Sequence, residues 1–191
     1  MAVDLVVADP QVHDRAARIL DFWFGIPRKQ QFAKDPVLDR IIAERWEGLR
    51  DDLLATRADG WRDHPDTLLA AIIVLDQFSR NIHRNSPEAF AADDLAAALT
   101  LEAITHGWER RYSAEQRAFL YMPLMHAEDG PLQALSLDRF AALGDAEQLD
   151  YAQQHAAVLA RYGRFPSRNA ALGRSSTAAE DVYLSRPGAG W

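Results

Sequence analysis

The sequence contains no cysteine, and this absence excludes disulfides, zinc–thiolate sites, iron–sulfur clusters and cysteine nucleophiles. Basic residues are outnumbered 21 to 28 by acidic ones, and the net charge of −7 argues against a nonspecific nucleic-acid-binding surface. The longest apolar run, Leu68–Leu75, is far shorter than the ~20 residues of a membrane-spanning helix. The first ten residues lack the basic segment of a secretory signal. We therefore expect a cytoplasmic protein with neither nucleic-acid nor membrane partners.

Lysine is almost absent: Lys29 and Lys34 are the only two, and the other 19 basic residues are arginine. A GC-rich coding sequence would produce this ratio, and the alanine-rich composition agrees with it. Arginine binds carboxylates and phosphates through two parallel hydrogen bonds, which lysine cannot form. Residues 151–174 contain four arginines and no acid, whereas residues 1–150 carry a net charge of −10. A wholly basic segment is thus present within an acidic chain.

Helix start and stop signals predict an all-α fold of seven or eight helices. Residues that typically cap the start of a helix occur at Asp9, Asp35, Ser86, Ser113, Asp129, Asp145 and Thr177. Each is followed by proline within two positions, or by glutamine or glutamate three positions later. No stretch alternates with the period of a strand, and short connections favour antiparallel helix pairs. The helix containing Leu68–Leu75 is apolar nearly all round, so we expect it at the centre. We predict one domain over residues 1–184 and a mobile tail over residues 185–191.

Three segments depart from the pattern of helices with polar outer faces. The first, residues 75–84, ends the apolar helix, yet helical spacing places several of its polar side chains within an arc of about 100°. The second, residues 121–129, contains a proline that we expect to end a helix. Beyond it, His126 and Glu128 would lie on extended backbone, where residues two apart share a face. The third, residues 155–174, contains the four arginines of the basic segment. If these segments meet in space, they form one polar pocket.

The same segments resemble, in order and spacing, the signature sequences of a bacterial family called domain of unknown function 924 (DUF924): LDQFSRNIHR, YMPLMHAED and GRFPSRNAALGR. The opening ILDFWFG is similar to the start of that family, so the resemblance extends over nearly the whole chain. It implies a helical fold of the tetratricopeptide-like superhelical class and no established activity. This sequence has Ser79, Ala127 and Ser167 where the family pattern has proline, serine and histidine. The last departure argues against a mechanism that requires a histidine at that position.

Our first hypothesis is a binding module whose pocket holds an anionic small molecule or the acidic end of a peptide. Arg84 and Arg168 are the leading contacts, because neither has an acid nearby in the sequence. For Arg80 the alternative is an intrahelical ion pair with Asp76, four positions earlier. The predicted ligand-binding residues are Arg80, Asn81, Arg84, His155, Arg164, Arg168 and Asn169.

The second hypothesis is a hydrolase or lyase in which His126 is the base and Glu128 orients it, as an acid–base pair. The alternative for both residues is a loop anchor before the next helix, which Asp129 caps. His155 shares a helical face with Leu159, so it is also a candidate for a hydrogen-bonded core residue. No local spacing typical of metal ligands joins the histidines. We expect neither a metal nor another cofactor.

The third hypothesis is a purely structural interaction scaffold, in which the polar segments fix the ends of helices. It predicts that replacing Asp76 or Arg80 by alanine mainly lowers stability, because breaking a buried ion pair costs about 3–5 kcal/mol. The three hypotheses differ in whether the polar segments line one open cavity. All three leave the oligomeric state open.

Overall fold

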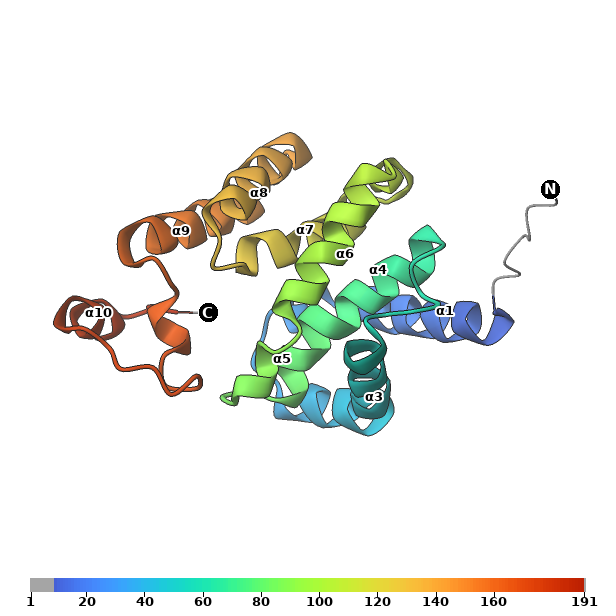
Figure 1. Ribbon diagram of the computed structural model, residues 1–191, viewed down its shortest axis with the longest axis horizontal. Helices are drawn as coiled ribbons and strands as arrows, with labels where there is room; N and C mark the ends of the chain where they lie inside the picture. The colour runs from blue at the N-terminus through green and yellow to red at the C-terminus, as the bar shows by residue number, and fades with distance from the viewer. Residues whose placement is uncertain (1–8, 191) are drawn as a thin grey trace.

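The computed structural model describes residues 9–190, in which all regular secondary structure is helical and no strand occurs (Figure 1). The predicted all-α class is confirmed. Residues 1–8 and 191, part of the predicted domain and tail, lie outside the described residues. No helix in the described part is long and apolar enough to cross a membrane. The α-helices are α1 (Pro10–Gly25), α2 (Arg28–Gln31), α3 (Pro36–Thr56), α4 (Pro65–Ile73), α5 (Ser79–Ile82), α6 (Asp93–Thr105), α7 (Ala114–His126), α8 (Gly130–Leu143), α9 (Ala146–Tyr162) and α10 (Ala178–Leu184).

Most helices begin at the caps that the sequence predicts. The Asp35 side chain accepts hydrogen bonds from the first turn of α3, and Asp145 does the same for α9. Ser113 forms a capping box at the start of α7, and Thr177 forms one at the start of α10. Each cap satisfies backbone N–H groups that have no partner inside the helix, which contributes about 1 kcal/mol. Local sequence therefore determines where these helices start.

Helix α4 lies at the centre of the fold, as its apolar sequence predicts. Every residue of Leu68–Leu75 is fully buried, and α1, α6 and α7 pack against α4. Full burial of a large aliphatic side chain contributes about 1.5–3 kcal/mol, so this run is a main source of stability. A π-helical turn, Val74–Phe78, continues α4 directly into α5, and α3 packs along both the turn and α5. This helix therefore brings the polar residues 75–84 into the interior.

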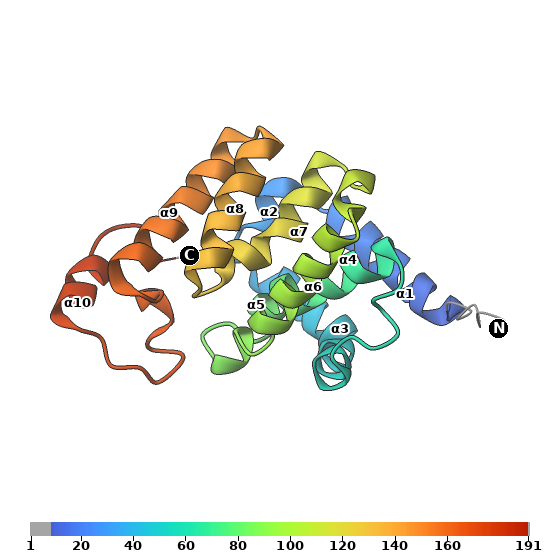
Figure 2. The same cartoon turned by 45° about the horizontal axis from the view of Figure 1, so that its top comes forward.

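Helices α7, α8 and α9 form a second layer on the other side of the molecule (Figure 2). Short loops join them, and α8 packs against both of its neighbours. Short connections of this kind place consecutive helices antiparallel. The packing agrees with the predicted helix pairs, and the tetratricopeptide-like superhelical class stays a prediction.

The expectation that Pro123 ends a helix is wrong, because α7 continues through it to His126. Proline removes one backbone hydrogen bond from a helix. Here the neighbouring side chains Met122, Leu124 and Met125 are all buried, and their packing maintains the helix. His126 is consequently the last helical residue of α7 and does not lie on extended backbone.

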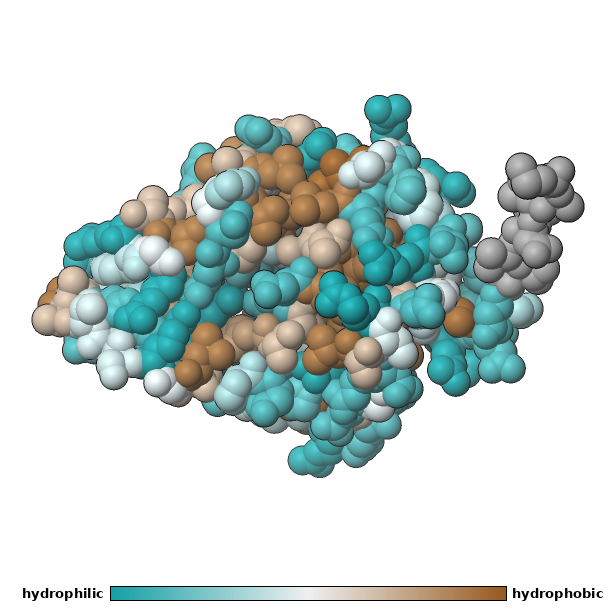
Figure 3. All heavy atoms as spheres, viewed as in Figure 1, coloured by the Kyte–Doolittle hydropathy of each residue, from teal (hydrophilic) through white to brown (hydrophobic). Residues whose placement is uncertain are grey.

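The chain beyond α9 forms a smaller unit beside the two layers. A 3-10 turn, Pro166–Arg168, packs against α10. The chain after α10 returns toward this turn. Gly190 approaches Ser167 so closely that a Cβ atom built on the glycine would lie 2.6 Å from the serine Cβ. Hydrophilic residues cover much of the face seen in Figure 3, and apolar residues gather on it in the region of α7 and α8. The mobility of the tail stays a prediction.

Candidate functional site

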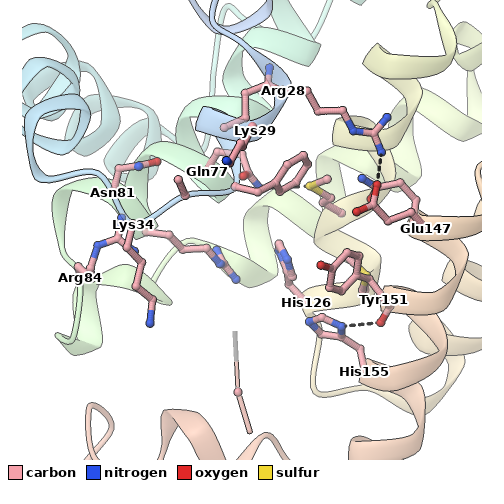
Figure 4. A pocket seen from close by; sticks show the side chains of 18 residues that line it. Arg28, Lys29, Lys34, Gln77, Asn81, Arg84, His126, Glu147, Tyr151 and His155 are labelled. Atoms are coloured by element: carbon pink, nitrogen blue, oxygen red, sulfur yellow. Dashed lines mark hydrogen bonds and ion pairs between the residues drawn. The ribbon is translucent and has the colours of Figure 1, made fainter. Parts of the chain in front are cut away.

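A cavity of about 620 Å³ lies between four helical parts of the chain, and Gly190, near the C-terminal end, also lines it. Helix α2 with the loop after it, the π-helical turn with α5, the end of α7 and the first half of α9 contribute its walls (Figure 4). A volume of this order suits a small organic molecule. Five predicted site residues line the cavity: Arg80, Asn81, Arg84, His126 and His155.

Several cationic side chains line the cavity. Lys29 and Lys34, the only lysines of the chain, both line it, and Figure 4 shows Lys34 near Arg84 and Asn81. No ion pair of either lysine is found among residues 9–190, and both side chains are exposed to solvent. Arg28 also lines the cavity but is paired with acidic residues of α9. The two ammonium groups are therefore available to an anion.

The arginines of α5 are held in place by carboxylates. Arg84 donates two hydrogen bonds to Asp39, at 2.8 and 3.0 Å, and Asn81 donates to the same carboxylate. Arg80 binds Asp93 through two hydrogen bonds, and its predicted pair with Asp76 is present at 3.1 Å. Arg84 has no acid nearby in the sequence, but the fold brings Asp39, 45 positions away, into contact with it. These pairs fix the orientation of the guanidinium groups at the cavity wall.

His126 and Asp76 form a carboxylate–imidazole pair beside these arginines. The distance from His126 Nδ1 to Asp76 Oδ1 is 2.7 Å, and Gln77 donates a hydrogen bond to the other carboxylate oxygen. An ionised carboxylate can only accept hydrogen bonds, so Nδ1 carries the proton of the neutral imidazole. The lone pair is consequently on Nε2. Asp76 thus determines the tautomer of the histidine.

Burial and charge determine the ionisation of this pair. Burial alone would raise the pKa of Asp76, but Arg80 and His126 outweigh it and hold that pKa well below its usual value. For His126, burial lowers the pKa despite the opposing effect of Asp76. Burial, together with nearby His126, lowers the pKa of His155 to about 3. Near pH 7 the cavity wall therefore carries two neutral imidazoles, and the ionised, buried carboxylate of Asp76 is bound to one of them.

The π-helical turn explains how Asp76 and Gln77 come to lie under the cavity. The turn covers Val74–Phe78, and all five of its residues are buried. One extra residue per turn changes the direction of the side chains that follow, and such turns occur frequently at functional sites. A continuous α-helix would point the side chains that follow Phe78 in other directions. The polar groups of this segment are therefore positioned by a local departure from α-helical geometry.

Arg168 does not line the cavity and connects the end of α7 to the start of α6. It donates to the backbone carbonyl of His126 at 2.7 Å and to the Asp93 carboxylate at 3.0 Å. Its guanidinium also lies over the rings of Phe90 and Phe165, at 4.7 and 4.8 Å from their centroids. Arg168 likewise has no acid nearby in the sequence, and its acidic partner in the fold, Asp93, is 75 positions away. In this structure Arg168 supports the site and does not line it.

The remaining predicted residues lie around the C-terminal unit. Glu128 binds Arg174 through two hydrogen bonds and accepts a third from the backbone of Phe165, so its partner is not His126. Arg164 binds Glu180. Asn169 donates to Ser176 and accepts a hydrogen bond from Arg174. Arginines of the basic segment thus pair with acids from other parts of the chain. Glu128, Arg164 and Asn169 do not line the cavity.

Sequence reasoning missed several residues that line or support the cavity. Lys29 and Lys34 were noted for the rarity of lysine and were not assigned to the site. Their closeness to each other in the sequence was the one available signal. The carboxylates Asp39 and Asp93 gave none, because each meets its arginine only in the folded chain. No group of three or more potential metal ligands occurs within residues 9–190.

Comparison with known proteins assigns the chain to a family. A family model described as bacterial protein of unknown function (DUF924) matches residues 19–188. The chain belongs to this family. A solved structure, of a protein of unknown function from Agrobacterium tumefaciens, is similar to this member of DUF924, with 34% sequence identity and a TM-score of 0.87. The similarity covers 91% of this chain and 98% of the other. A search of curated proteins found no significant match.

Proposed function

We propose that the protein binds a small organic anion, a carboxylate or a phosphate, in the cavity between α2, α5, α7 and α9. The observation that supports this function is the position of Lys29 and Lys34. Both line the cavity, and no carboxylate among residues 9–190 pairs with either of them. Arg84, held by Asp39, contributes a third cation on the same side. A ligand anion would provide the missing counter-charge.

The rest of the lining indicates that the ligand has an apolar part. Phe32, Met122 and Met125 line the cavity together with Tyr151. Phe32 is half exposed, although apolar side chains of this size gain about 1.5–3 kcal/mol from burial. A ligand with an aromatic or aliphatic body would cover this ring while its anionic group contacts the lysines. The acidic end of a peptide would use the same cations, and the cavity volume favours a small molecule over it.

Phenyl phosphate is a suitable probe, because it combines an aromatic ring with a phosphate. We expect calorimetry to show binding at one site per chain. The double variant Lys29→Gln/Lys34→Gln should bind at least about tenfold more weakly, since a hydrogen bond to a charged group contributes about 1.5–3 kcal/mol. The matched control is Arg15→Gln/Arg18→Gln, which removes two exposed positive charges of α1 outside the cavity. If both double variants bind phenyl phosphate equally weakly, the loss of net charge alone explains the effect and the proposed site is refuted.

A further inference from the structure

His126, with the buried carboxylate of Asp76 bound to it, faces the same cavity as the lysines. Figure 4 shows His126 and His155 across the cavity from Asn81, Arg84 and Lys34. The side chain of His126 retains 14% of its exposure, whereas that of Asp76 retains 1%. A fixed, neutral imidazole at the wall of a cavity is the arrangement of a general base. A ligand whose anionic group is held by the lysines and whose body extends across the cavity would therefore reach a proton acceptor.

We propose that this cavity catalyses proton transfer, with Nε2 of His126 as the base that removes a proton from the bound anion and Asp76 as the residue that positions it. This inference rests on the proposed anion site and adds a reaction to it. The substrate class is a small carboxylate or phosphate with an acidic proton on a hydroxyl group or on a carbon next to a carbonyl. Enzymes of the isomerase and lyase types begin with such a step.

The step balances within the site. The bond from the ligand to its proton breaks, and its electron pair stays on the ligand as a negative charge. The proton bonds to Nε2 through the imidazole lone pair, and Asp76 stabilises the imidazolium through the 2.7 Å contact at Nδ1. Arg80, which lines the cavity and pairs with Asp76 at 3.1 Å, would stabilise the charge on the ligand. Return of the proton to another atom of the ligand completes an isomerisation.

The groups around His126 favour the neutral base. Asp76 and Asp93 favour the protonated form, whereas Arg80 and burial disfavour it, and the balance lowers the pKa of His126. His155 lies with its ring centroid 5.9 Å from that of His126 and is itself neutral near pH 7. Arg168 binds the backbone carbonyl of His126 and fixes the end of α7. The base is thus ready to accept a proton at pH values where an ordinary histidine is partly protonated.

Iodoacetate tests this base without knowledge of the natural ligand. It is a small carboxylate, and an imidazole lone pair attacks its carbon as the carbon–iodine bond breaks and iodide leaves. The chain has no cysteine to compete for the reagent. Peptide mapping by mass spectrometry then gives separate rates for His126 and for His106, an exposed histidine outside the cavity. Iodoacetamide has the same reactive carbon and no charge, so it serves as the control for anion binding.

We expect iodoacetate to alkylate His126 at least tenfold faster than His106, and phenyl phosphate to protect His126. Asp76→Asn should slow the reaction of His126 about tenfold, whereas the exposed control Asp138→Asn should leave it unchanged. Because the pKa of His126 is lowered, its alkylation rate should stay constant to a lower pH than that of a histidine with the ordinary pKa of about 6.5. The pH profile is measured on the unaltered protein, so it remains decisive if Asp76→Asn does not fold.

The outcomes separate this inference from the proposed function. If phenyl phosphate binds but His126 reacts no faster than His106, the anion site stands and the proton-transfer role is overturned. If the rate at His126 is unaffected by Asp76→Asn, Asp76 does not position the base, and the proposal fails in that part. If iodoacetate and iodoacetamide react equally fast at His126 and phenyl phosphate gives no protection, the anion site fails and the proposed substrate class fails with it.

Discussion

His126 Nδ1 lies 2.7 Å from Asp76 Oδ1, although the two residues are 50 positions apart in the sequence. The contact joins the π-helical turn after α4 to the end of α7, the two elements that meet beneath the cavity. It therefore connects the most buried helix of the fold to the site. Stability, ionisation and the proposed function all depend on this contact.

Asp76→Asn should destabilise the protein by about 3–5 kcal/mol at pH 7, because Arg80 and His126 lose a buried charged partner. The folded-state pKa of Asp76 is below its unfolded value of 3.8. Its contribution is therefore complete above about pH 4 and is lost as the pH falls through the folded-state pKa. Urea unfolding at steps from pH 7 to pH 3 should show a constant difference from the unaltered protein down to about pH 4 and a smaller one below.

The control for this prediction is Asp138→Asn, which changes an exposed carboxylate of α8. It should alter the unfolding free energy by less than about 0.5 kcal/mol at every pH. A small effect of Asp76→Asn at pH 7, similar to that of the control, would contradict the buried ion pair.

His155→Gln should reduce the acid sensitivity of the fold. Burial lowers the pKa of His155 to about 3, so below its unfolded pKa of 6.5 the unfolded chain binds the extra proton. This group then destabilises the fold by up to about 1.4 kcal/mol per pH unit between pH 6.5 and pH 3. Unfolding free energies measured from pH 7 to pH 4.5 should decline less steeply in His155→Gln than in the unaltered protein. His106→Gln, at an exposed position, should keep the original slope.

Arg168→Lys should cost nearly as much stability as Arg168→Ala, about 2–4 kcal/mol. A lysine retains the charge but cannot donate in two directions to the His126 carbonyl and Asp93 while lying flat between Phe90 and Phe165. Thermal and urea unfolding of the two variants provide the comparison. Near-complete rescue by lysine would show that only the charge at this position matters.

Glu128→Gln should lower stability by about 1 kcal/mol and leave the cavity unaffected. Its carboxylate is partly exposed and binds Arg174, in the C-terminal unit. We expect unchanged affinity for phenyl phosphate and an unchanged alkylation rate at His126. A loss of His126 reactivity as large as that in Asp76→Asn would instead support the His126–Glu128 acid–base pair that the sequence predicted.

The helices could be predicted from the sequence because their signals are local. Asp35, Ser113 and Thr177 act within four residues of themselves, and the apolar run Leu68–Leu75 indicates its own burial. Pro123 is the exception among local signals, since tertiary packing maintains a helix that the proline alone would interrupt.

The partners in the site could not be predicted in the same way. Arg84 meets Asp39 across 45 positions and Arg168 meets Asp93 across 75, so neither pair leaves a local pattern. The basic segment suggested an anion site because its arginines have no acids nearby in the sequence. In the folded chain those arginines are largely neutralised, and the available cations are the two lysines of the N-terminal part. The sequence therefore indicated five residues that line the cavity, and the anion site itself stays a prediction.

A crystal structure of the protein soaked with phenyl phosphate would show whether the cavity binds an organic anion. The account predicts the phosphate between Lys29 and Lys34, with the ring on the side of Phe32 and Met122 and with part of the ligand within contact of His126. Ligand density elsewhere on the surface, or an empty cavity at concentrations that saturate the calorimetric site, would contradict it.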